Sequence, residues 1–390
     1  MKNNFKIGIA FLAIAVIIVS VFAVTYFSQP NNSTSPSPSA SSSASPSPTT
    51  TVTSNMKIIL NGAGASFPYP LLSGIIDVYT NIESNAQINY QPSGSGAGIT
   101  SLENKLVDFA ASDAPLSASE METIPNVVQM PETIGAVVIT YNLGSETPNG
   151  IKLTGQVIAD IFQGKITKWN DGSITALNSG ITLPDQTINV VHRSDGSGTT
   201  HIFTSYLSVV STSWESEIGK GKSVAWPTGV AASGNAGVAG IVNGSQYSIG
   251  YVELAYANEN SMYVAKVQNP AGNFILPTTV STEVAAASAA SQGLPAGDES
   301  WTNASLLNAQ DPEAYPIVSF SYLMVYKELN VISGMTQEKA TALVEFLWYV
   351  MHDGQETAPE LSYAQLPTNV VKINETTLKT ITYNGHTLIS

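Results

Sequence analysis

The sequence predicts an α/β protein with two lobes and a ligand-binding cleft between them. Short apolar runs that resemble strands are followed repeatedly by a glycine-rich turn and then by a helical pattern, which is typical of such folds. One of these turns, residues 192–200, follows the apolar run Ile188–Val191 and carries an arginine. Two longer β-rich runs, Ile134–Tyr141 and Ile317–Tyr326, begin about 180 residues apart and are expected to cross between the lobes.

The folded body begins near Met56 and alternates strands with helices. Strands are expected at Lys57–Leu60, Ile88–Tyr90 and Val107–Ala111, with turns at 61–68, 94–98 and 112–115, and helices at Pro70–Asn81 and around Ile99, Leu102 and Leu106. The two crossover runs then divide the body. Residues 56–138 and 318–390 are expected to form lobe I, and residues 139–317 lobe II. Three of the turns would face the fourth, 192–200, across the cleft.

The turn at 192–200 has the chemistry of an oxyanion site. Backbone N–H groups at a helix start, together with the positive end of the helix, favour an anion in the turn. Arg193 offers a planar fork of donors, and further donors follow at Ser197, Gly198 and Thr199. Asp195 is expected either to cap the helix or to hold Arg193 in position, and both roles are compatible.

The turns of lobe I add weaker signals of the same kind. Ser66 offers a hydroxyl and Phe67 an N–H just before Pro68, although Ser66 alone is equally consistent with a simple helix cap. Ser95 lies among glycines that allow close backbone approach. Asp113 places a carboxylate beside the expected anion. That position is favourable only if the anion carries a hydrogen, as phosphate does and sulfate does not; the alternative is an ordinary turn aspartate.

Composition excludes several classes of function. The 390 residues are 43% hydrophobic and 11% charged, with a formal net charge of −14, so nucleic-acid binding is not expected. The same charge disfavours long-range attraction of anions, and the site must act through short-range hydrogen bonds. The chain has no cysteine, and none of its four histidines has the spacing of a metal pair. No metal or other cofactor is expected.

The N-terminal region predicts attachment to a membrane. Residues 7–27 form an uncharged apolar run long enough to span a bilayer, and Lys2 and Lys6 place residues 1–6 in the cytoplasm. The alternative is a cleaved signal peptide. Residues 28–55 are rich in Ser, Thr and Pro and predict a disordered, glycosylated stalk that leaves the body outside the cell. Acceptor triplets for N-linked glycans occur at Asn31, Asn32, Asn243, Asn303 and Asn374.

Six blocks in order along the body resemble the phosphate-binding protein of the high-affinity phosphate ABC importer. They are Gly62–Pro68, Asp108–Ser117, Gly164–Trp169, Arg193–Thr199, Phe203–Leu207 and Ile249–Glu253. The resemblance implies a class II periplasmic-binding-protein fold that closes over phosphate and delivers it to permease subunits and, through them, to the ATPase. It also implies a monomer with arsenate as a competing ligand. The implied ligand contacts are Ser66, Phe67, Ser95, Asp113, Arg193, Ser197, Gly198 and Thr199, with Asp195 paired to Arg193.

The chain departs from that family at three places. Ser66 replaces the commoner threonine and keeps the hydroxyl, while Gly96 and Ala97 stand where a serine and a glycine are usual. The bacterial lipoprotein cysteine is absent, and the N-terminal helix and stalk in its place suggest an archaeal cell surface. Two alternatives remain open. One is a binding protein for another oxyanion, such as sulfate or molybdate; the other is an exported phosphatase-like hydrolase, for which neither a Gly-x-Ser-x-Gly elbow nor a phosphate-binding P-loop motif is present.

The Asp113→Asn variant tests this interpretation of Asp113. An amide no longer repels an unprotonated oxygen and can donate to it, so the variant should bind sulfate while it retains phosphate. Isothermal titration calorimetry with each anion measures both outcomes. A variant that still ignores sulfate would show that Asp113 does not sense the proton of the ligand.

Overall fold

The computed structural model describes residues 57–145, 147–288 and 293–389. They belong to a compact unit that spans Ser54–Ser390. The expected cytoplasmic N-terminus, membrane helix and stalk at residues 1–55 lie outside the described residues, as do the glycan acceptors Asn31 and Asn32. Of the helices that are described, none is both long and apolar enough to cross a bilayer.

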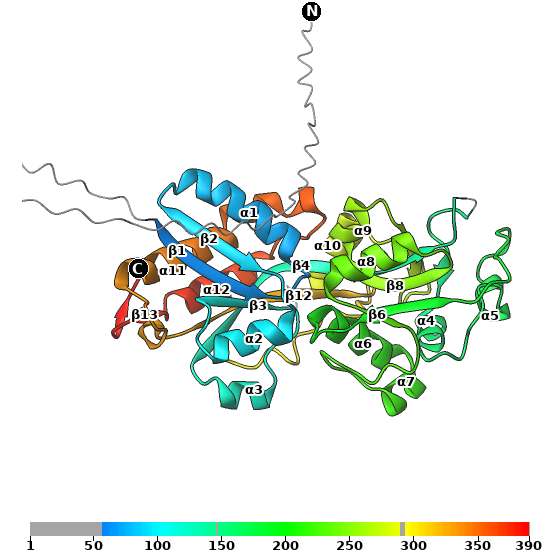
Figure 1. The fold of residues 1–390 in the computed structure, drawn as a ribbon, viewed down its shortest axis with the longest axis horizontal. Coiled ribbons are helices and arrows are strands. Elements are labelled where there is room, and N and C mark those ends of the chain that lie inside the picture. Colours follow the sequence, from blue (N-terminus) through cyan, green and yellow to red (C-terminus); the bar gives the residue numbers. More distant parts are fainter. Residues whose placement is uncertain (1–56, 146, 289–292, 390) are drawn as a thin grey trace, which may run out of the picture. The chain divides into compact units, whose positions relative to one another are not determined.

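The centre of the molecule is a nine-stranded mixed sheet with the order β2-β1-β3-β12-β4-β8-β6-β7, and β9 also pairs with β4 (Figure 1). Its strands are β1 (Ile58–Gly64), β2 (Ala86–Gln91), β3 (Phe109–Ser112), β4 (Val127–Asn142), β6 (Asn189–Arg193), β7 (Val230–Ala232), β8 (Ser248–Glu253), β9 (Tyr263–Val264) and β12 (Val318–Tyr326). Smaller sheets contain β5 (Lys152–Leu153), β10 (Lys266–Gln268) and β11 (Phe274–Ile275), and separately β13 (Thr382–Tyr383) and β14 (His386–Thr387).

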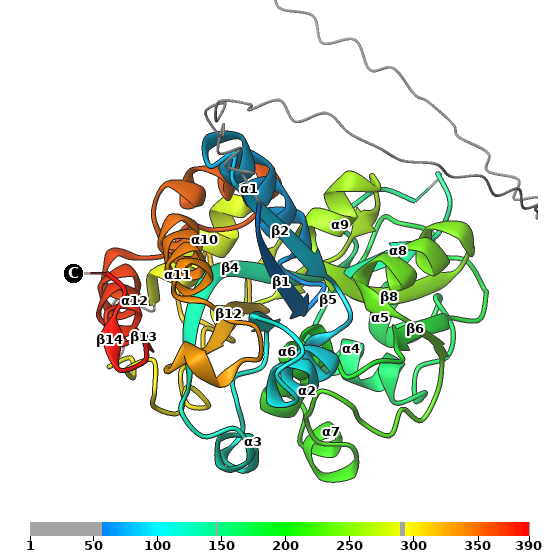
Figure 2. The ribbon, with the colours of Figure 1, turned by 60° about the vertical axis from the view of Figure 1, so that its left-hand side comes forward.

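The helices lie on both faces of this sheet (Figures 1 and 2). They are α1 (Tyr69–Ile82), α2 (Ser95–Glu103), α3 (Ala118–Thr123), α4 (Gly155–Phe162), α5 (Gly172–Thr175), α6 (Gly198–Val210), α7 (Thr212–Glu217), α8 (Gly234–Gly244), α9 (Leu254–Glu259), α10 (Thr279–Ala287), α11 (Gln337–Met351) and α12 (Thr368–Leu378). The short 3₁₀ helices Leu329–Val331, Asp353–Thr357 and Pro359–Leu361 complete the described elements. Alternation of strands and helices confirms the expected α/β class.

The succession of strand, turn and helix in the sequence predicts a parallel sheet, and this prediction is wrong at the centre. β1 runs parallel to β2 and β3, and β6 runs parallel to β7 and β8, but β12 is antiparallel to both β3 and β4. The cause is the connectivity of the chain. β12 follows β6, β7 and β8 in the sequence, and it lies between β3 and β4 with its direction opposite to both. β4 is likewise antiparallel to β8.

β4 takes part in both halves of the sheet. Its residues 127–136 pair with β12, and its residues 137–142 pair with β8. It is therefore longer than the expected strand Ile134–Tyr141. The register between β4 and β12 shifts at Ser321, which pairs with Thr133, whereas Tyr322 pairs with Pro131. Glu132 is the extra residue of this β-bulge.

The C-terminal helices close the core beneath the first strands. α11 packs on β1, and the ring of Phe346 lies 5.8 Å from Phe109 and 5.3 Å from Tyr79, measured between ring centroids. Burial of these aromatic rings joins chain segments more than 200 residues apart into one apolar core. Trp169 and Tyr251 are both fully buried.

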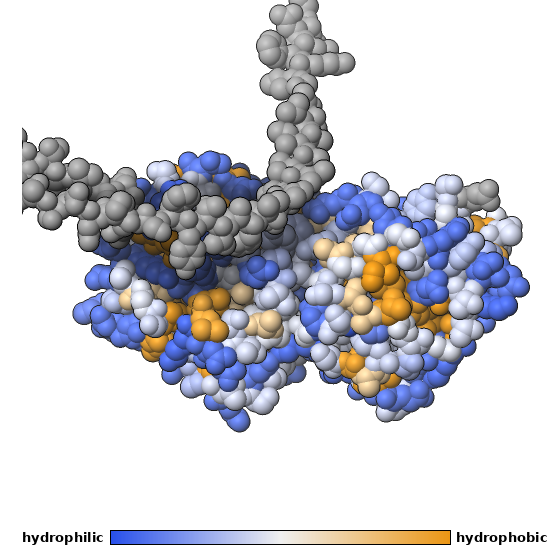
Figure 3. All heavy atoms as spheres, viewed as in Figure 1, coloured by the Kyte–Doolittle hydropathy of each residue, from blue (hydrophilic) through white to orange (hydrophobic). Residues whose placement is uncertain are grey.

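The exposed apolar side chains are distributed over several elements. They include Ile82 on α1, Leu106 after α2, Val209 on α6 and Val280 on α10. On the face drawn in Figure 3, hydrophobic residues form separate patches between hydrophilic ones. The apolar residues visible on this face are therefore divided among several patches.

The expected turn at 94–98 is instead the start of a helix. Only Gly94 precedes α2, and its φ of +97° is one that glycine adopts readily. Gly98 lies on the buried side of the helix, where α2 packs directly against β1. A Cβ atom at Gly98 would lie 2.4 Å from the Cα of Gly64 and 2.8 Å from the carbonyl oxygen of Ala63. The glycines of this block thus serve helix packing as well as the loop.

We expect the Gly98→Ala variant to destabilise the protein by about 1–3 kcal/mol, because the added methyl group must displace the backbone of β1. Gly240→Ala is the matched control, since Gly240 is an exposed residue of α8 with nothing within 4 Å of the position of a Cβ. That control should gain about 0.5–1 kcal/mol from the higher helix propensity of alanine. Urea unfolding of both variants measures the difference, and equal stabilities would contradict the close contact of α2 with β1.

Candidate anion-binding site

The predicted residues meet where strands of the two halves of the sheet end. β1, β2, β3 and β6 finish at Gly64, Gln91, Ser112 and Arg193, and α1, α2 and α6 follow β1, β2 and β6. The views of Figures 1 and 2 place α2 beside α6. A backbone hydrogen bond of 2.8 Å, from the N–H of Gly96 to the carbonyl of Gly196, joins these loops directly. Residues about 100 positions apart thus share one buried polar cluster.

Ser66 and Phe67 are held by their carbonyl groups. The hydroxyl of Tyr256 donates to the Ser66 carbonyl at 2.6 Å, and the hydroxyl of Tyr363 donates to the Phe67 carbonyl at 2.6 Å. The ring of Phe67 is fully buried in the core. The N–H of Phe67 has no acceptor among the described residues. The backbone at this position is therefore fixed, with its donor still available.

Ser95 links the loop of β3 to the start of α6. Its hydroxyl oxygen accepts the N–H of Gly198 at 3.0 Å and that of Asp113 at 3.4 Å. A Cβ atom at Gly198 would lie 2.5 Å from Oδ2 of Asp113 and 2.6 Å from Oγ of Ser95. Only glycine allows the three groups to approach so closely.

Arg193 is the only arginine of the sequence, and its side chain is 1% exposed. Its Nε and Nη2 donate to the two carboxylate oxygens of Asp195 at 2.8 and 2.5 Å, and its Nη1 donates to Oγ1 of Thr199 at 3.3 Å. One edge of the guanidinium is thus occupied by Asp195, as expected. Three of the five N–H donors of the guanidinium are engaged in these bonds, so one donor on Nη1 and one on Nη2 remain available for an anion.

Asp195 also stabilises the loops around the arginine. Burial opposes ionisation of its carboxyl, but hydrogen bonds and charge from Arg193 outweigh this effect and lower the pKa. The N–H of Gly234 donates to Oδ1 of Asp195 at 3.1 Å and connects the start of α8 to the pair. Asp195 does not cap α6; that role belongs to Ser197, whose hydroxyl oxygen accepts the N–H of Thr200 at 3.0 Å.

Asp113 is one end of a chain of buried oxygens. The hydroxyl group of Ser321 lies 2.9 Å from Oδ1 of Asp113 and 3.0 Å from Oε1 of Glu132. Both carboxyl groups are 1% exposed. One hydroxyl proton can serve only one of them, so the second link requires a proton on a carboxyl group. The chain therefore favours a state in which Asp113 and Glu132 are not both ionised.

The electrostatics agree with this count of protons. Burial raises the pKa of Asp113 to about 7, against the opposing effects of the Ser321 hydrogen bond and the charge of Arg193. Burial raises the pKa of Glu132 to about 8, and the charge of Asp113 adds to that increase. Near neutral pH at least one proton is thus shared within the group. Asp113 is therefore not permanently ionised near neutral pH.

The structure brings together all the residues that the sequence singles out, and it adds three. Asn235 was missed although it follows the strand β7 in a glycine-rich segment, Ser233–Gly237, that resembles the turn at 192–200. Ser321 and Glu132 lie within strands. Polar residues alternate with apolar ones in many strands, so the sequence pattern did not mark these two as site residues.

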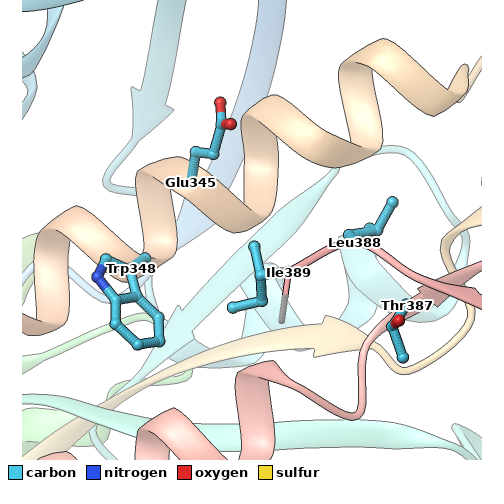
Figure 4. A pocket seen from close by; sticks show the side chains of 5 residues that line it. All are labelled: Glu345, Trp348, Thr387, Leu388 and Ile389. Carbon is cyan, nitrogen blue, oxygen red and sulfur yellow. The ribbon is translucent and has the colours of Figure 1, made fainter.

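A surface groove of about 600 Å³ lies elsewhere in the fold. It is lined by Glu345 and Trp348 of α11 and by residues 387–389 (Figure 4). None of the candidate residues lines this groove. The anion site is thus identified by converging polar groups rather than by the size of a cavity.

Comparison with known proteins identifies close relatives. A family model described as a PBP superfamily domain matches residues 35–353. The chain is 43% identical to the phosphate-binding protein PstS of Xylella fastidiosa over 318 residues, which cover 80% of this chain and 83% of that protein. It is 40% identical to the PstS of Methanocaldococcus jannaschii over 332 residues, covering 81% and 84% of the two chains.

Solved structures show the same fold. A high-affinity periplasmic phosphate-binding protein of the DING type, solved with phosphate, superposes with a TM-score of 0.62 at 22% identity, covering 80% of this chain and 92% of that one. A substrate-binding protein of Clostridium perfringens gives a TM-score of 0.55 at 17% identity, covering 79% and 100%. These matches confirm a periplasmic-binding-protein-like α/β fold.

The Glu132→Gln variant tests the buried carboxyl chain. Burial raises the pKa of Glu132 from its ordinary value of 4.5 to about 8. The contribution of protonated Glu132 to the free energy of unfolding is therefore complete below about pH 4.5 and is lost as the pH rises through 8. Glutamine keeps the donor and cannot ionise. The variant should therefore gain thermal stability over the wild type between pH 6 and pH 9, by about a few kcal/mol.

Differential scanning calorimetry of the ligand-free proteins at several pH values measures this gain. Glu122→Gln is the matched control, since Glu122 is exposed on α3 and should follow the wild type at every pH. Parallel stability profiles for Glu132→Gln and the wild type would contradict a protonated Glu132.

Proposed function

The chain belongs to the PstS family of phosphate-binding proteins, and we propose from this premise that its buried polar cluster binds inorganic phosphate for delivery to an ABC permease. The observation that carries the proposal is the convergence of hydroxyl groups, backbone donors, one guanidinium and one carboxyl at the strand ends. Like these relatives, the protein is a binding protein and not an enzyme.

The proposed ligand contacts are those expected from the sequence: Ser66, Phe67, Ser95, Asp113, Arg193, Ser197, Gly198 and Thr199. Hydroxyl and N–H groups supply most of the donors, and Arg193 supplies the one guanidinium. Because Asp195 already neutralises much of that charge, the affinity depends on directed hydrogen bonds. Some of these groups also bond to one another, as the N–H of Gly198 does to Ser95.

Discrimination between phosphate and sulfate is proposed to depend on Asp113. When the carboxyl is ionised, it accepts the hydrogen of a phosphate and repels a bare sulfate oxygen. When it is protonated, it can itself donate to sulfate. Since burial raises its pKa to about 7, rejection of sulfate should weaken as the pH falls below this value. The preference of ionised Asp113 for a ligand that carries a hydrogen is the main reason to propose phosphate, and not sulfate or molybdate, as the ligand.

We also propose the wider organisation expected from the sequence. Residues 56–138 with 318–390, and residues 139–317, would form two lobes of a class II binding protein, with β4 and β12 as the crossover strands. A helix at 7–27 and a stalk at 28–55 would hold a monomeric body at the outer surface of an archaeal-type cell. Glycans would fit the exposed Asn243 and Asn303, whereas Asn374 is fully buried with its amide donating to Pro131, which argues against modification there.

Calorimetric titration of the full-length chain with phosphate, sulfate and arsenate at pH 5 and pH 8 tests the function. Phosphate should bind at both values, arsenate should compete with it, and sulfate should bind better at pH 5. Arg193→Ala should weaken phosphate binding by about 2–4 kcal/mol, because it removes charge-assisted bonds and leaves Asp195 unpaired. Lys165→Ala, which removes an exposed ion pair with Glu217, should not alter affinity.

A chemical test is available because the sequence contains a single arginine. Phosphate should slow the reaction of the protein with an arginine-directed dicarbonyl reagent, followed by mass spectrometry. No heat of binding with phosphate would refute the proposed function.

A further inference from the structure

Asn235 at the start of α8 is fully buried and contacts residues from both halves of the sheet. Its Oδ1 accepts the backbone N–H of Glu253 at 3.0 Å. A backbone N–H can only donate, so this bond fixes which end of the amide is oxygen and which is nitrogen. The Nδ2 atom therefore faces the anion site.

The amide nitrogen of Asn235 reaches two hydroxyl groups of the site. It lies 3.1 Å from Oγ of Ser66 and 3.1 Å from Oγ1 of Thr199. Both hydrogens of the amide are thus directed to hydroxyl oxygens. Ser66 follows β1, whereas Thr199 lies in α6, so one side chain connects the two sides of the site.

Each of these hydroxyl oxygens receives a second donor. The backbone N–H of Asn235 also donates to Ser66 at 3.1 Å, and Nη1 of Arg193 also donates to Thr199 at 3.3 Å. A hydroxyl group has two lone pairs and one proton. With both lone pairs engaged, only the proton remains, and within the described residues neither hydroxyl donates it to another group.

We propose that Asn235 is a positioning residue that makes Ser66 and Thr199 obligate hydrogen-bond donors toward the ligand. The inference rests on the proposed function and deepens it. Oxygens of the ligand that face these two hydroxyls must be bare acceptors. A hydrogen carried by the ligand is therefore excluded there and directed to Asp113, the carboxyl of the site that is not paired with Arg193.

This arrangement defines the ligand more narrowly than charge does. The best ligand is a tetrahedral oxyanion that presents unprotonated oxygens to Ser66 and Thr199 and one protonated oxygen to Asp113. Selectivity then depends on the pattern of donors and acceptors, because an unsatisfied or opposed polar group in a buried site is costly.

The Asn235→Asp variant replaces the amide nitrogen by an oxygen at nearly the same shape and keeps an acceptor for Glu253. The hydroxyls of Ser66 and Thr199 can then turn toward the new carboxylate. We expect phosphate affinity to fall about tenfold or more in the wild-type background. In the Ser66→Ala background the same substitution should cost at least about threefold less, because one of the hydroxyls is absent.

The double-mutant cycle separates positioning from simple repulsion. Repulsion between the introduced carboxylate and the anion acts in both backgrounds and cancels, while the effect through Ser66 does not. The neutral variant Asn235→Leu, run through the same cycle, should give coupling of the same sign. Equal losses of affinity in the two backgrounds, for a folded variant, would overturn the proposal.

Asn178→Asp provides a matched control. Asn178 is a buried amide whose Oδ1 accepts the N–H of Lys152 and whose Nδ2 donates to two carbonyl groups, away from the site. It should lose stability without a change in phosphate affinity. Calorimetry gives the affinities, and thermal unfolding shows that each variant is folded. If the wild type itself gives no heat with phosphate, the proposed function fails; if only the coupling is absent, this inference alone fails.

Discussion

The burial of one positive charge is the constraint on which the candidate site depends. A guanidinium withdrawn from water must be paired and hydrogen-bonded, or the fold loses stability. Asp195 meets this requirement, and in doing so it leaves the site with little net charge. In a chain of formal net charge −14, an anion is then held by oriented dipoles, and the positions of hydroxyl and N–H groups decide what can bind.

The neighbouring buried carboxyl groups also require hydrogen-bond partners. Ser321 can give its proton to Asp113 or to Glu132, so a second proton must be present for both contacts to exist. On the other side of the site, Asn235 saturates two hydroxyl oxygens. The groups of the site thus fix one another's roles as hydrogen-bond donors and acceptors.

Local patterns made much of this arrangement predictable. The turn at 192–200 was found because strand, glycine and helix signals are contiguous in the sequence, and Asp113 was found because it directly follows the strand pattern at 107–111. The start of α2 was misjudged, since glycines at 94–98 indicate a turn locally but are required by contact with β1. Glu132 could not have been found, because its position depends on a bulge created by pairing with β12, almost 190 residues away. Long-range register has no local signature.

β4 has a mechanical consequence for the molecule. One continuous strand of 16 residues is hydrogen-bonded to β12 along its first part and to β8 along its last part. Any rotation of one half of the sheet against the other must therefore be taken up as torsion within this strand and in the connections beside it. The pairing of β4 changes from β12 to β8 between residues 136 and 137, so neither partner strand spans this point on both sides. A twist of one half against the other would be concentrated there, away from the bulge at Glu132.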